Sequence, residues 1–117
     1  MKDLFDKENR PWGSFYVLYE EKNFKIKKIT VKPKSRLSYQ YHNKRSELWY
    51  VISGVGIVTI NNKKINLKAG SIVKIDIRDK HRVENNGSEN LVFIEIQTGS
   101  YFGEDDIVRL DDDYNRK

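Results

Sequence analysis

Short runs of alternating hydrophobic and polar residues, separated by turn-forming residues, cover most of this chain. Valine, isoleucine, threonine and aromatic residues dominate these runs, and in a strand every second side chain faces the same side of the sheet. The pattern predicts strands at residues 24–33, 37–42, 47–53, 55–60, 63–67, 71–77, 81–85 and 91–97. Strands that are this short and this evenly spaced favour an all-β sandwich or small barrel.

The residues between these runs predict where the chain turns. Asn61-Asn62 tolerates the positive φ of a tight hairpin, and Asn86-Gly87 marks another turn. Within residues 24–33 the alternation changes phase at Lys27-Lys28, which predicts a β-bulge. No window longer than about ten residues follows a helical period, so helices should be short. After a barrel core at about residues 10–103, the acidic segment 104–117 is expected to form an irregular tail or a short helical turn.

The bulk composition sets limits on the class of protein. A length of 117 residues suits one compact domain and is too short for two. The absence of cysteine excludes disulfides, thiolate metal sites and cysteine nucleophiles. The longest apolar runs fall far short of the roughly 20 residues that cross a membrane, and residues 1–8 contain no apolar signal core. We therefore expect a soluble, cytoplasmic protein without a membrane partner.

The net charge of +5 and the pI near 9.3 raise the question of nucleic-acid binding. The lysines are dispersed along the chain, however, and no basic helix, zinc finger or aromatic RNA-binding motif accompanies them. A solvated, lysine-rich surface explains the charge, and no nucleic-acid partner is expected. The same excess of positive charge would favour a small anionic substrate.

The two histidines of the sequence, His42 and His81, point most directly to chemistry. Side chains two apart in a strand share a face, so Gln40 and His42 should point the same way. A loop over residues 43–46 would then return the chain and place Glu47 beside His42. Two imidazoles, a carboxylate and an amide oxygen suit one divalent transition metal. The alternative is that each histidine is only a hydrogen-bonded polar residue.

Three arginines lie close in sequence to these candidate ligands: Arg36, Arg45 and Arg82. The guanidinium fork suits phosphate or carboxylate, although a surface ion pair is the alternative for each of them. Arg45 lies in the loop between two candidate ligands and is therefore the best functional candidate. Two roles, lining a sugar pocket and packing in the core, are the alternatives for five aromatic residues: Trp12, Tyr39, Tyr41, Trp49 and Tyr50.

At these positions the chain resembles the cupin superfamily of double-stranded β-helix (jelly-roll) barrels. The stretch Gln40-x-His42-x4-Glu47-x6-Gly54 resembles the first cupin motif, with glutamine in place of its first histidine. The stretch Gly70-x10-His81-x3-Asn85 resembles the second motif.

The resemblance is closer still to the cupin domain of type II mannose-6-phosphate isomerases, which commonly follows a mannose-1-phosphate guanylyltransferase domain. It extends over residues 10–116, and glutamine at the Gln40 position is usual in that family. The stretches that carry it are residues 10–15, 24–33, 36–42, 80–85 and 99–109. The chain departs from the family pattern at Asn43-Lys44, Leu48, Asp76 and Arg78, and nothing in it resembles the guanylyltransferase.

The resemblance implies a metal-dependent isomerase that interconverts mannose 6-phosphate and fructose 6-phosphate. It implies a metal held by Gln40, His42, Glu47 and His81, with zinc first and manganese, iron, cobalt or nickel as alternatives. Arg45 and Glu47 would be catalytic, and Arg36 and Arg82 would bind the sugar phosphate. Cupins are often dimers, so a homodimer is expected. Two alternatives stay open: a nucleotide-sugar epimerase or ketoisomerase with a histidine base, and a non-enzymatic, sugar-binding regulatory cupin.

Overall fold

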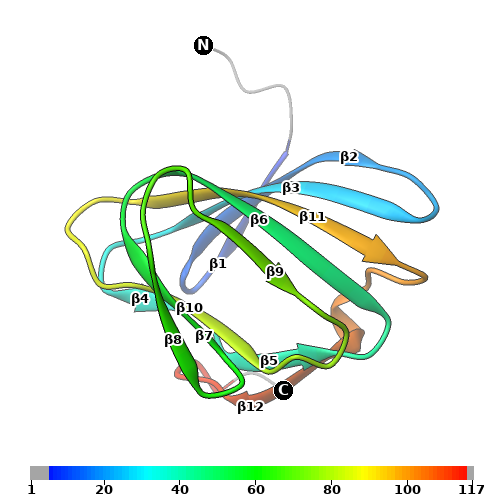
Figure 1. The fold of residues 1–117 in the computed structure, drawn as a ribbon. Coiled ribbons are helices and arrows are strands. Elements are labelled where there is room, and N and C mark those ends of the chain that lie inside the picture. The colour runs from blue at the N-terminus through cyan, green and yellow to red at the C-terminus, as the bar shows by residue number, and fades with distance from the viewer. Residues whose placement is uncertain (1–5, 116–117) are drawn as a thin grey trace.

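The computed structural model describes residues 6–115, which form two facing antiparallel sheets (Figure 1). The first sheet has the order β1-β2-β3-β11-β6-β9. Its strands are β1 (Lys7–Arg10), β2 (Gly13–Glu20), β3 (Phe24–Val31), β11 (Leu91–Gly99), β6 (Arg45–Ser53) and β9 (Ile72–Ile75). The all-β class predicted from the pattern is confirmed.

The second sheet has the order β12-β5-β10-β7-β8, and β4 pairs with β10 beside this path. Its strands are β12 (Ile107–Asp111), β5 (Tyr39–His42), β10 (His81–Asn85), β7 (Gly56–Ile60), β8 (Lys63–Leu67) and β4 (Ser35–Arg36). The Asn61-Asn62 hairpin between β7 and β8 is confirmed, since both residues have positive φ, 48° and 71°. Among residues 6–115, no helix has the length and apolar character needed to cross a membrane.

The inward side chains of the first sheet divide the barrel interior into an apolar half and a polar half. Strand pairing places polar residues beside polar ones and apolar residues beside apolar ones: Glu95 lies opposite Lys27 in β3, Gln97 opposite Glu47 in β6, and Phe93 opposite Ile29. The buried residues that change from apolar to polar along each strand are Leu91, Phe93, Glu95 and Gln97 in β11, Val51, Trp49, Glu47 and Arg45 in β6, and Val31, Ile29 and Lys27 in β3. The apolar half is the hydrophobic core, and we call the polar half the chamber.

The prediction of a β-bulge at Lys27-Lys28 is wrong. β3 pairs with β11 without interruption, and Lys27, Ile29 and Val31 are all buried on one face. The prediction failed because a lysine was assumed to face solvent, whereas this one faces the barrel interior. The register shift lies in β2 instead, between Val17 and Tyr19.

The acidic C-terminal segment contributes more than the expected tail. It does contain a helical turn, the 3-10 helix η1 (Glu104–Asp106), but β12 follows and pairs with β5. The side chain of Asp106 is buried and accepts hydrogen bonds from the backbone N–H groups of Asn43 and Lys44, at 3.2 and 3.0 Å. The segment thereby fixes the turn that joins β5 to β6. Residues 116–117, which belonged to the expected tail, lie outside the described residues.

Candidate metal centre

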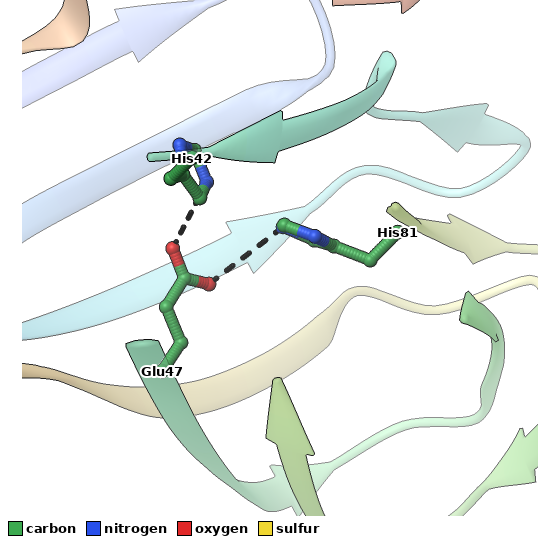
Figure 2. A group of neighbouring side chains, drawn as sticks. All are labelled: His42, Glu47 and His81. Atoms are coloured by element: carbon green, nitrogen blue, oxygen red, sulfur yellow. Dashed lines mark ion pairs between the residues drawn. The ribbon is translucent and has the colours of Figure 1, made fainter. Parts of the chain in front are cut away.

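Three buried side chains from three strands meet in the chamber: His42 ends β5, Glu47 lies near the start of β6, and His81 opens β10. Their potential ligand atoms all lie within 4.8 Å of one another. Figure 2 shows the carboxylate of Glu47 between the two imidazoles. Its Oε2 lies 3.2 Å from Nε2 of His42, and its Oε1 lies 3.9 Å from Nε2 of His81.

Gln40 belongs to the same neighbourhood. It is buried, lines the cavity beside the three residues, and its Cα is paired with that of His81 across β5 and β10. Its amide nitrogen donates to the backbone oxygen of Ser38 at 3.5 Å. Because the amide nitrogen is the group engaged there, the amide oxygen is left to act as an acceptor or a ligand. The structure thus brings together all four residues that were predicted as ligands.

The protonation states of the cluster suit a divalent cation. Burial would raise the pKa of Glu47, but the hydrogen bond with His42 and the charge of Arg45 hold this pKa well below its usual range. Burial lowers the pKa of His81, which favours the neutral imidazole. Nδ1 of His81 lies 2.9 Å from the carbonyl oxygen of Asp79, so Nδ1 carries the hydrogen and Nε2 keeps its lone pair. A carboxylate and a neutral imidazole are the forms that bind metal.

Arg45 lies against the cluster rather than in a loop. It is the first residue of β6, and it is 5% exposed. Its Nε donates to Oε2 of Glu47 at 3.0 Å, and its Nη2 lies 3.3 Å from Nε2 of His42. The indole N–H of Trp49 donates to the other oxygen of Glu47, also at 3.0 Å. The carboxylate is therefore fixed in orientation by two donors.

The other two arginines engage the C-terminal segment. Arg36 donates from two nitrogens to the carboxylate of Asp113, at 2.7 and 2.9 Å, and is not brought to the cluster. Arg82 does line the cavity, but its Nε donates to the backbone oxygen of Leu37 and its Nη2 to that of Asp111, at 2.7 and 2.9 Å. Both guanidinium groups are therefore already engaged in hydrogen bonds that hold the C-terminal segment in place.

Of the five aromatic residues considered for a sugar pocket, Trp12 and Trp49 line the cavity and the three tyrosines do not. Asn85, which ends the second motif, lies outside the cluster and is fully hydrogen-bonded. Its amide nitrogen donates to the backbone oxygens of Val31 and Glu89, and its oxygen accepts from the N–H of Gly87. The asparagine of that motif therefore holds the turn after β10.

The chamber contains a cavity of about 70 Å³ beside the cluster, and several residues that line it were not predicted as site residues from the sequence. Glu95 and Lys27 are the most buried charged residues among these. Burial, together with the nearby charge of Glu47, raises the pKa of Glu95 to about 8. A signal was present in the sequence, because Glu95 and Gln97 continue the phase of Leu91 and Phe93 along β11.

Comparison with known families shows where the chain belongs. A family model described as "Mannose-6-phosphate isomerase C-terminal" matches residues 2–112. The chain belongs to this family. Proteins similar to the chain include a mannose-1-phosphate guanylyltransferase of Klebsiella pneumoniae, 43% identical over 107 residues, and the alginate biosynthesis protein AlgA of Pseudomonas aeruginosa, 47% identical over 107 residues. These matches cover 92% of the chain but only 23% and 22% of the two relatives.

Solved structures confirm that this family member has the cupin double-stranded β-helix fold. The capsular polysaccharide assembling protein CapF of Staphylococcus aureus superposes with a TM-score of 0.79 at 19% identity, covering 94% of the chain and 32% of CapF. A double-stranded β-helix protein of Klebsiella pneumoniae gives a TM-score of 0.76 at 20% identity, with 90% of each chain covered. At such low identity, the likeness concerns the fold alone.

Proposed function

We propose that this chain is a metal-dependent sugar-phosphate isomerase that interconverts mannose 6-phosphate and fructose 6-phosphate. The observation that supports the proposal most is the buried cluster of His42, Glu47 and His81 beside Arg45, in a member of the mannose-6-phosphate isomerase C-terminal family. The cavity next to the cluster gives a small substrate a place to meet it.

The donor set fits a divalent metal, with His42, Glu47 and His81 as ligands and Gln40 as the fourth. Nitrogen and oxygen donors in this number favour zinc, and they also accept manganese, iron, cobalt or nickel. A bound ion of this kind would act as a Lewis acid toward the oxygens of the sugar.

The protein side chains have distinct roles in this proposal. An aldose–ketose isomerisation moves a proton between adjacent carbons through an enediolate whose oxygens become negative. Arg45 is buried and fixed by Glu47, so its guanidinium can stabilise such charge without reorganising. Both oxygens of Glu47 already accept hydrogen bonds, from Arg45 and Trp49. Glu47 is thus held as a ligand, and its catalytic contribution would be to position the metal.

The relatives also support a broader biological role. The relatives named for alginate and xanthan biosynthesis, from Pseudomonas aeruginosa and Xanthomonas campestris, match the chain at 47% and 43% identity. We infer that the isomerase would supply hexose phosphate for the biosynthesis of a polysaccharide.

The proposal is tested by assaying the purified chain with mannose 6-phosphate and with a panel of other hexose phosphates, after addition of zinc, manganese or cobalt. We expect mannose 6-phosphate to be converted to fructose 6-phosphate, and the activity to be lost on chelation and restored by metal. The variant Glu47→Gln removes the carboxylate of the cluster. Its matched control is Glu84→Gln, which removes a carboxylate on the outer side of β10. Full activity after chelation would instead favour a histidine-based epimerase, and binding without turnover would favour a regulatory cupin.

A further inference from the structure

Lys27 is a buried cation without an acceptor. Its side chain points into the chamber from β3, and the residue is 7% exposed. Among residues 6–115 its ammonium group makes no hydrogen bond and no ion pair. Nζ lies over the ring of Phe15, 4.2 Å from the ring centroid. Burying a cation that has no hydrogen-bond acceptor is unfavourable, so a group kept in this state calls for a ligand of opposite charge.

A second cation lies beside the same aromatic ring. The guanidinium carbon of Arg10 is 4.9 Å from the centroid of Phe15, and the side chain of Arg10 is 24% exposed. Arg10, Phe15 and Lys27 line the inner cavity and also a wider depression of about 440 Å³ that opens to solvent. The three residues therefore mark the passage from solvent to the metal cluster.

The acidic groups near this passage leave Lys27 unmatched. Glu95 lies opposite Lys27 in the sheet, but the two make no ion pair, and Oε1 of Glu95 accepts a hydrogen bond from the side-chain amide of Gln97 instead. Glu104 binds Arg10 at 3.0 Å, and Asp6 and Glu8 lie only on the outer depression. An anion that reaches Lys27 would thus contact the ammonium group deeper in the cavity than the carboxylates of Asp6 and Glu8.

We propose that Lys27 and Arg10 form the subsite for the phosphate group of the substrate, with Lys27 as its principal donor and Arg10 exchanging Glu104 for the phosphate. A ligand whose sugar carbons lie at the cluster would extend outward past Phe15, which places its far end between these two cations. An ammonium and a guanidinium together match a phosphate dianion. The inference rests on the proposed function for the identity of the substrate, but it assigns the phosphate to residues other than Arg36 and Arg82.

The experiment measures binding by titration calorimetry to the whole chain, with inorganic phosphate, fructose 6-phosphate and fructose as probes. Lys27→Met should weaken both phosphate-containing probes by a factor of about 10 or more, the value of one charge-assisted hydrogen bond, and leave fructose unchanged. Lys28→Met, on the outer face of the same strand, removes the same charge and should change nothing. Lys27→Met should also melt no lower than the wild type, because it removes a buried charge.

Equal binding of phosphate and fructose 6-phosphate by Lys27→Met and Lys28→Met would overturn the subsite, even if the wild type is an active isomerase. Selective weakening by Lys27→Met would support the subsite, even if the wild type binds hexose phosphates without converting them. If Lys27→Met does not fold, Arg10→Gln decides, since that side chain lies at the surface. Loss of phosphate affinity in Arg10→Gln supports the subsite, and unchanged affinity overturns it.

Discussion

Glu47 connects nearly every interaction of the candidate metal centre. Its two oxygens face two imidazoles, a guanidinium and an indole N–H, and it is almost completely buried. A carboxylate in this position neutralises Arg45 and presents a negative charge to a cation. The cluster can therefore be tested at this one residue.

We expect Glu47→Gln to lose bound metal and to lower the free energy of unfolding by about 3 kcal/mol, because the charge of Arg45 stays buried without its partner. Metal content follows from elemental analysis of the purified protein, and stability from urea unfolding. Glu84→Gln should match the wild type in both measurements. Wild-type metal content in Glu47→Gln would contradict the assignment of Glu47 as a ligand.

At the residue scale, two rules predicted that Gln40, His42 and Glu47 lie together, whereas His81 was added by the resemblance to the second cupin motif. Strand alternation put Gln40 and His42 on one face, and a short turn returned Glu47 beside them. Lys27 and Glu95 were not selected, because charged residues in strands usually face solvent and the barrel closure that buries them is a long-range effect. Their burial depends on which strands pair, and local pattern does not contain that information.

At the scale of single elements, the turn between β9 and β10 departs from the family pattern in a visible way. Arg78 stands where the second cupin motif has glycine, and its φ is 69°, in the left-handed region that glycine favours. Its backbone N–H donates to the carbonyl oxygen of His42 at 2.8 Å. The turn thus holds a non-glycine residue in a backbone conformation that glycine adopts more readily.

Replacing Arg78 by glycine should therefore raise the free energy of unfolding, by up to about 1 kcal/mol after the added entropy of the unfolded glycine is subtracted. Urea unfolding at equilibrium measures the change. Arg78→Ala is the control, since it removes the side chain and keeps the strained φ, and it should show no gain. A gain of equal size in both variants would assign the effect to the side chain.

A second prediction at this scale concerns Asp106, because its side chain fixes the turn between the candidate ligands His42 and Glu47. Asp106→Asn leaves a buried amide facing two backbone N–H groups and should cost about 1–3 kcal/mol of stability, with weaker metal binding as Glu47 loses its fixed position. Denaturant unfolding and metal titration give the two values. Asp105→Asn, in the same 3-10 turn but exposed, should change neither.

Most strands were predictable, and the exceptions have physical causes. β1 and β2 were not predicted as strands, although they form a hairpin at the edge of the first sheet. β12 was hidden by its acidic surroundings, although Ile107 and Val108 favour a strand. β12 gains its structure from pairing with β5, a strand distant in the sequence.

At the scale of the whole molecule, the cluster bridges the two sheets. Glu47 belongs to the first sheet, and His42 and His81 belong to the second. A metal ion bound between them would connect the sheets directly, so its binding free energy would add to the stability of the fold.

Chelation should consequently lower the melting temperature. With free metal at 100 times its dissociation constant, linkage contributes about 2.7 kcal/mol, or roughly 10 °C for a domain of this size. Differential scanning calorimetry with and without chelator measures the shift, and added metal should reverse it. Glu47→Gln should melt at the same temperature under both conditions. If the wild-type protein melted at the same temperature with and without chelator, this result would argue against a resident metal.

The division of the barrel into an apolar half and a polar chamber also has a consequence for motion. Along β6, the segment at Val51 is closed by tightly packed apolar side chains, whereas the segment at Arg45 is closed by polar groups that water can solvate when they separate. One strand should thus open to solvent at two very different rates. Amide hydrogen exchange would be slowest around Val51 and Phe93 and faster toward Arg45. The chamber could then open locally and admit a ligand while the rest of the barrel stays closed.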